Sequence, residues 1–145
     1  MIVISGFEPF GRHAVNSSEA LVRAAERSSR LTGLIARSVI LPVEFDRCYA
    51  ILHDILESTP HRAVVCFGQT TYSEARLEHV ARNRDHVRDG EPPRHRERVI
   101  RAEAPPELSS TLPLEDIATG LTTAGIPFAH SDDAGGYVCN NLFFH

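Results

Sequence analysis

The chain has 145 residues, 42% of them hydrophobic and 23% charged, and it carries a net charge of −4. This length suits one domain, residues 1–145, that buries roughly two thirds of its unfolded surface. The negative charge disfavours a nucleic-acid partner, because phosphate binding depends on basic side chains, and the absence of lysine among the fifteen basic residues excludes lysine-based covalent catalysis.

The first 70 residues alternate apolar runs of strand length with segments of helical spacing. The apolar runs are bounded by turn residues, which is typical of buried strands, and a serine at 17 or 18 can cap the first helix. The predicted strands are 1–5, 34–43 and 61–68, and the predicted helices are 18–29 and 45–59.

The second half begins with residues 73–83, of which 76–82 alternate well enough to predict a strand. A polar tract from Arg84 to about Ser110 has no clear period and predicts a long excursion with short extended pieces. Beyond it, the pattern predicts a helix at 110–125, a strand at 126–131 and a helix within 135–145. Strands alternating with helices predict an α/β fold with a mostly parallel sheet covered on both faces, where ligands gather at the carboxyl ends of strands.

The loop GFEPFG, residues 6–11, follows the first predicted strand. Its glycines suggest a phosphate-binding loop, but Arg12 and His13 stand where such a loop has lysine and serine or threonine. Phe7 and Phe10 can instead line a small apolar pocket at the working edge of the sheet, or simply pack under the loop.

Cys139 is predicted to lie in the first turn of the last helix. A helix N-terminus favours the thiolate, and its N–H groups can hold an oxyanion, so Cys139 is a candidate nucleophile. The alternative is an inert core residue, which is the role expected for Cys48 and Cys66. Three widely spaced cysteines predict neither a disulfide framework nor a zinc site.

Glu78 alternates with His79 in a predicted strand, so the two side chains should point to opposite faces. Glu78 can either orient an imidazole or be an exposed edge charge. The tract 82–101 interleaves arginines with acidic residues, which predicts a solvated face rather than a nucleic-acid patch.

Four motifs occur together in this order: SGFEPFG with Asn16 behind it, FGQTTYSEARLEHVARN, STLPL and SDDAGGYVCN. In this combination the chain resembles the pyroglutamyl-peptidase I family, also called pyrrolidone-carboxylate peptidases. The resemblance covers nearly the whole chain. It implies a cysteine peptidase that removes N-terminal pyroglutamyl residues from peptides, with a Glu, Cys and His triad on a three-layer α/β/α sandwich.

The resemblance also implies roles for six residues. Cys139 would be the nucleophile and Glu78 the acid that orients the imidazole. The remaining four would bind substrate, with two rings on the pyrrolidone, an amide beside it and an arginine near the oxyanion. These four are Phe7, Phe10, Gln69 and Arg88.

The departure from the family concerns the histidine, which in the family lies on a further strand beyond the nucleophile helix and before a closing helix. His145 is six positions after Cys139, about 9 Å along a helix axis, and is unsuited to a direct pair. We therefore expect a sandwich lacking its last strand and helix. Two hypotheses follow, an active peptidase and an inactive truncated pseudo-enzyme or pyroglutamyl-binding module, with an unrelated small-ligand α/β domain as a third.

The sequence further predicts a cytoplasmic protein. No apolar run approaches the roughly 18 residues of a membrane span, and the N-terminus lacks the features of a signal peptide. Peptides with N-terminal pyroglutamate are the expected partners, with no nucleic acid, membrane, cofactor or metal. An exposed sheet edge at the missing strand also predicts self-association into a homo-oligomer.

Overall fold

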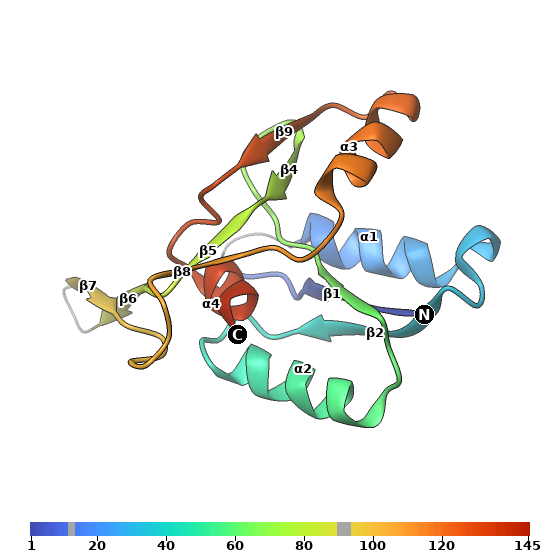
Figure 1. Cartoon of the computed structure of the whole chain (residues 1–145). Helices are drawn as coiled ribbons and strands as arrows, with labels where there is room; N and C mark the ends of the chain where they lie inside the picture. The colour runs from blue at the N-terminus through green and yellow to red at the C-terminus, as the bar shows by residue number, and fades with distance from the viewer. Residues whose placement is uncertain (12–13, 90–93) are drawn as a thin grey trace. The chain divides into compact units, whose positions relative to one another are not determined.

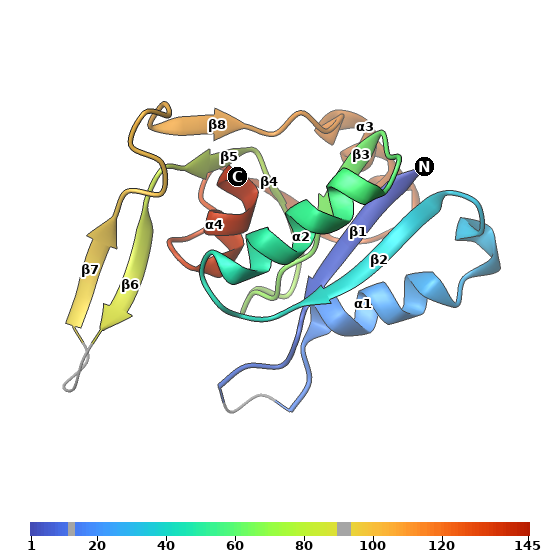
Figure 2. The same ribbon diagram turned by 90° about the horizontal axis from the view of Figure 1, so that it is seen from below.

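A computed structural model describes residues 1–11, 14–89 and 94–145, with the backbone alone for 87–89 and 94–96. The chain divides into two compact units, Met1–Thr70 and Thr71–His145. Figures 1 and 2 show the elements of each unit from two sides. Among the described residues, no helix is long and apolar enough to cross a membrane.

The first unit is built around a parallel three-stranded sheet with the order β2-β1-β3. Because the chain moves from β1 to one neighbour and then back past it to the other, two right-handed crossovers place the connecting helices on opposite faces. Figure 1 shows α1 and α2 on the two sides of this sheet. The elements are β1 Ile2–Phe7, α1 Ser17–Glu26, the 3-10 helix η1 Ser29–Leu31, β2 Ile35–Leu41, α2 Arg47–Ser58 and β3 Ala63–Cys66.

Helix α1 lies very close to the end of β1. A Cβ atom placed on Gly6 would be 2.6 Å from the backbone oxygen of Ser18 and 3.1 Å from Cγ2 of Val22. The Phe7 N–H donates a hydrogen bond of 2.9 Å to Ser18 Oγ. Gly6 therefore allows the helix to reach the strand and the hydroxyl of Ser18 to bind it.

The prediction that Ser17 or Ser18 caps α1 is wrong. The N-cap is Asn16, whose Oδ1 accepts from the Ser18 N–H at 2.9 Å and from Ser18 Oγ at 2.7 Å. Asparagine and serine have similar capping preferences, so local sequence could not decide between them. The buried contact of Ser18 with β1 decides it.

The cysteines of the first unit differ from each other. Cys48 is fully buried in α2, as expected for a core thiol. Cys66 was also expected in the core, but it is exposed at the end of β3, an edge strand of this sheet. Desolvation nevertheless raises the pKa of the Cys66 thiol.

The second unit combines a parallel strand pair with two antiparallel pairs. Strand β4 pairs with β9, β5 with β8, and β6 with β7, the last as a hairpin that is clearest in Figure 2. Three of these strands lie in the tract predicted to hold short extended pieces. The elements are β4 Ala75–Glu78, β5 Val80–Arg82, β6 Asp85–Asp89, β7 Arg94–Arg98, β8 Glu107–Ser109, α3 Leu114–Thr123, β9 Phe128–Ser131 and α4 Val138–Phe144.

The strand predicted over 76–82, within the segment 73–83, is divided at His79. The His79 N–H donates to the Ser131 oxygen at 2.7 Å, whereas its own oxygen accepts from the Ser110 N–H at 2.8 Å. The chain therefore changes partner at this residue, from β9 to the segment that follows β8. An alternating pattern gives no signal for a change of partner, since both halves remain extended.

Replacing Gly6 with alanine tests the close approach of α1. Because the new Cβ would meet backbone atoms of Ser18, we expect Gly6→Ala to lower the free energy of unfolding by about 2 kcal/mol in urea titration. A Cβ atom placed on Gly120, inside α3, would meet no atom of the surrounding structure within 4 Å. Gly120→Ala is the matched control and should stabilise by about 1 kcal/mol. Equal effects of the two changes would contradict the close approach.

Candidate active site

In the first unit, the loops after β1 and β3 leave the carboxyl ends of neighbouring strands. The strand order reverses between these two strands, which is where ligands bind in open α/β sheets. Gln69 follows β3, and its Oε1 accepts from the Ser17 N–H at 2.8 Å, in the first turn of α1. Asn16 Nδ2 donates to the Glu8 oxygen at 3.1 Å. Both loops are thus fastened to the start of α1.

The two phenylalanines of the GFEPFG loop have different environments. Phe7 is only 3% exposed and belongs to the core at the end of β1, whereas Phe10 is half-buried. The alternative that the ring packs under the loop thus describes Phe7 better than Phe10. Phe10 has the more accessible ring.

Cys139 is the second residue of α4 and is half-buried. The N-cap residue Tyr137 has extended backbone dihedrals and makes no capping hydrogen bond with its side chain. The neighbours of Cys139 on the helix, Val138 and Asn140, are both buried. The predicted position in the first turn of the last helix is therefore correct.

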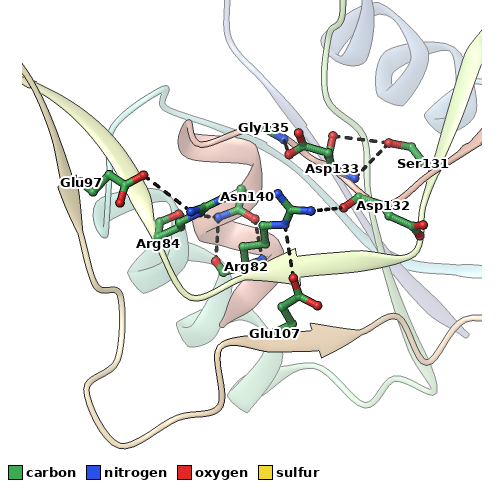
Figure 3. Close-up of polar contacts among 9 residues, drawn as sticks. All are labelled: Arg82, Arg84, Glu97, Glu107, Ser131, Asp132, Asp133, Gly135 and Asn140. Atoms are coloured by element: carbon green, nitrogen blue, oxygen red, sulfur yellow. Dashed lines mark hydrogen bonds and ion pairs between the residues drawn. The ribbon is translucent and has the colours of Figure 1, made fainter.

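The turn that leads into α4 is held by its own polar side chains (Figure 3). Asp133 Oδ1 accepts from the Gly135 N–H at 3.0 Å, and Ser131 Oγ accepts from the Asp133 N–H at 3.3 Å. Arg82 Nη2 donates to the Asp132 oxygen at 3.3 Å, which joins the turn to β5. These contacts fix the approach to Cys139 from two strands.

Glycine is required at the two glycine positions of this turn for different reasons. Gly135 has φ +78°, a region that favours glycine. At Gly136 a Cβ would lie 2.6 Å from Cγ of the His86 ring, and the backbone N–H of His86 donates to the Gly136 oxygen at 2.6 Å. The first glycine serves the backbone turn, and the second makes room for a histidine.

Asn140 anchors α4 to β5 with three hydrogen bonds (Figure 3). Its Oδ1 accepts from the Arg82 N–H at 2.8 Å, and its Nδ2 donates to the oxygens of Arg82 and Arg84 at 2.9 Å each. The side chain is fully buried. Asn140 follows Cys139 directly, so this anchor sets where the thiol lies relative to β5.

Glu78 is the last residue of β4 and pairs with Ser131 of β9, the residue that begins the turn toward Cys139. Its Oε2 is buried and has no hydrogen-bond partner among the described residues. His79 is bonded elsewhere, since its Nε2 lies 2.6 Å from Nδ1 of His130. This agrees with the expectation that Glu78 and His79 do not act as a pair.

Arg88 lies on β6, where its backbone pairs with that of His95, and its side chain is outside the described part of the structure. Two arginines of the tract whose side chains are described pair with exposed acids. Arg82 lies 3.5 Å from Glu107, and Arg84 lies 3.6 Å from Glu97. The acids of these two pairs are exposed, as expected for a solvated face.

Asp85 departs from that pattern and was missed in the sequence. It is 0% exposed, although it stands in a tract of alternating charges. Its partners come from β7 and α4, far along the chain, so no local signal distinguishes it. Among the described residues, no group of three or more histidine, cysteine, aspartate or glutamate side chains could hold a metal ion.

Replacing Asn140 with alanine tests the anchor of α4. The change leaves backbone groups of β5 without partners, so we expect a loss of about 3 kcal/mol in the free energy of unfolding. Under conditions where the protein stays folded, the alkylation rate of Cys139 should also change, as followed by peptide mass spectrometry.

Asn83 supplies the matched control, because it also makes three hydrogen bonds to backbone, with Arg101 and Ala104. Asn83→Ala should destabilise to a similar extent but leave the alkylation rate of Cys139 at its original value. If both variants alter Cys139 equally, the specific role of Asn140 is refuted.

Comparison with solved structures confirms the predicted α/β fold with a mostly parallel sheet. Pyroglutamyl peptidase I from Bacillus amyloliquefaciens superposes with a TM-score of 0.85 at 28% identity, covering 99% of this chain and 70% of that chain. Pyrrolidone carboxyl peptidase from Fervidobacterium islandicum AW-1 gives a TM-score of 0.86 at 25% identity, with 99% and 70% covered.

Sequence comparison points to the same family. The pyrrolidone-carboxylate peptidase of Gloeobacter violaceus is 37% identical over 147 residues, covering 99% of this chain and 71% of that protein. That of Streptococcus pyogenes serotype M4 is 32% identical over 146 residues, covering 99% and 67%. A family model described as pyroglutamyl peptidase matches residues 1–145. The chain belongs to the pyroglutamyl peptidase family.

Proposed function

We propose that this protein removes N-terminal pyroglutamyl residues from peptides, with Cys139 as the nucleophile. Its family consists of peptidases, so its substrates are peptides. The observation that carries the proposal is the position of Cys139. It lies in the first turn of a helix anchored by Asn140, and the turn into that helix starts at the strand paired with Glu78.

The reaction would proceed in two steps through a thioester. The Cys139 thiolate attacks the pyroglutamyl carbonyl carbon, and the resulting oxyanion collapses as the C–N bond breaks and the leaving amine is protonated, the step for which the family resemblance implies an imidazolium. Water then attacks the thioester carbonyl, and the second oxyanion collapses as the C–S bond breaks, which releases pyroglutamate and the Cys139 thiolate. Arg88 is the proposed side chain for stabilising the oxyanion, since a guanidinium donates strong hydrogen bonds to anionic oxygen.

Glu78 is the proposed orienting acid for that imidazole. A buried carboxylate oxygen is costly to leave without a donor, and Glu78 Oε2 has none among the described residues. An imidazole N–H would satisfy it and be held in one tautomer. Three described histidines of the second unit are not assigned to this role, because His79 is bonded to His130 and His86 lies 3.3 Å from Glu97.

The substrate pocket is proposed at the loops after β1 and β3. A pyrrolidone ring is small and uncharged, so a selective site needs apolar walls and a few polar groups for the lactam. Phe10 would contact the ring, with Phe7 fixing the loop from the core, and Gln69 would lie beside the lactam. The cytoplasmic location, the single domain and a homo-oligomer remain predictions.

Hydrolysis of a pyroglutamyl-aminomethylcoumarin substrate tests the function directly. We expect release of coumarin, and a loss of at least about 1,000-fold in kcat/KM for Cys139→Ala, because removing a nucleophile abolishes covalent catalysis. Cys66→Ala is the control and should retain activity. In the wild-type protein the Cys66 thiol has a raised pKa, so it stays protonated at neutral pH and should react slowly with alkylating reagents.

Absence of hydrolysis would refute the catalytic proposal for this chain. In that case a pyroglutamyl aldehyde separates the binding module from an unrelated domain. Protection of Cys139 from alkylation by the aldehyde indicates a pocket without turnover, and no protection refutes the pocket as well.

Replacing Glu78 with glutamine tests the orienting acid. Glutamine keeps the shape but loses the charge that stabilises an imidazolium, so kcat should fall by roughly 100-fold to 10,000-fold with little change in KM. Glu74→Gln, which removes a half-buried carboxylate 3.7 Å from Arg76, is the control and should leave both constants unchanged. A normal kcat for Glu78→Gln would contradict the assignment.

A further inference from the structure

We infer that Asp85 is a positioning residue for the nucleophile, because it ties the helix of Cys139 to the β6–β7 hairpin. This inference rests on the proposed function of Cys139. Asp85 Oδ2 accepts two hydrogen bonds, from Arg98 Nη2 at 2.7 Å and from Asn141 Nδ2 at 2.8 Å. One carboxylate oxygen therefore joins β6, β7 and α4.

Because this junction is buried, its carboxylate must be compensated by a counter-charge and by hydrogen bonds. The side chains of Asp85 and Asn141 are both 0% exposed, and Arg98 lies opposite Asp85 in the ladder of β6 and β7. An ionised carboxylate away from water needs a counter-charge and hydrogen bonds, and removing either partner is costly. Arg98 supplies the charge, and Asn141 supplies a further donor from the helix.

The contact with Asp85 is made from the side of α4 that lies opposite Cys139. Asn141 lies two residues after Cys139, which is about 200° around a helix, so the two side chains leave nearly opposite sides of α4. Asn140, between them, bonds to β5. Two adjacent amides thus fasten α4 to β5 and β6, and Cys139 remains half-buried on the other side.

The same junction links two parts of the proposed site. Arg88 lies three residues after Asp85 on the same strand. A shift of α4 against β6 would change the distance between the nucleophile and the strand of Arg88. Since misplacement by about 1 Å can cost roughly 100-fold in rate, a rigid contact at Asp85 has a direct catalytic consequence.

The experiment compares the wild-type protein with Asp85→Asn and with the exchange Asp85→Asn/Asn141→Asp, under conditions where all are folded by circular dichroism. Two quantities are measured, the alkylation rate of Cys139 with iodoacetamide across pH, and kcat and KM for the pyroglutamyl substrate. Alkylation of Cys66 in the same samples is the internal reference. Glu107→Gln, which alters an exposed carboxylate beside Arg82, is the matched control.

For Asp85→Asn we expect kcat to fall by roughly 100-fold with KM within about threefold, and the alkylation rate of Cys139 to change by about tenfold. The exchange variant returns a carboxylate and an amide to the same junction beside Arg98. It should recover a substantial part of the wild-type kcat and of the wild-type alkylation rate of Cys139. A role in stability alone would lower the urea midpoint of Asp85→Asn but leave kcat and alkylation unchanged, and that result would overturn the inference.

The inference and the proposed function can fail separately. If the wild-type protein hydrolyses nothing but Asp85→Asn alters Cys139 alkylation and the exchange restores it, the function fails and the positioning of Cys139 stands. Unchanged alkylation in an inactive protein overturns both. Unchanged kcat in an active protein overturns the positioning role alone.

Discussion

The second unit depends on the way the end of β5 completes its backbone hydrogen bonds. The Asn83 N–H bonds to the Pro106 oxygen on the side of β8, so its neighbour Arg82 directs its N–H and oxygen to the opposite edge. No strand pairs there in the described part of the chain. The amide of Asn140 takes that place, accepting and donating as a strand would. The helix is thus attached to the sheet by a side-chain amide that makes the hydrogen bonds a neighbouring strand would make.

This arrangement explains why so short a helix can present a defined residue. A helix of seven residues has little stability of its own in water. Here Asn140 and Asn141 are both fully buried, and apolar residues such as Phe144 are buried further along. Packing and polar contacts therefore hold α4 in place. The Cys139 thiol in its first turn is positioned by the strands to which the helix is attached.

Local periodicity predicted most elements of the first unit, because its helices and strands alternate in short, regular segments. It failed where a distant contact decides between similar local choices, as at Asn16, where the contact of Ser18 with β1 selects the cap. The change of partner at His79 and the burial of Asp85 had the same cause, since both depend on residues some 13 to 56 positions away. The motif around Cys139 located the candidate nucleophile, but it gave no hint of the support behind the helix.

The contact between His86 and Gly136 has an implication for how this chain can vary. The imidazole occupies the volume that any side chain at residue 136 would need. The two positions are 50 residues apart, yet they share one space, so a larger residue at 136 requires a smaller or differently directed one at 86. Among relatives these two positions should covary, so that a large side chain at one of them is accompanied by a small residue at the other.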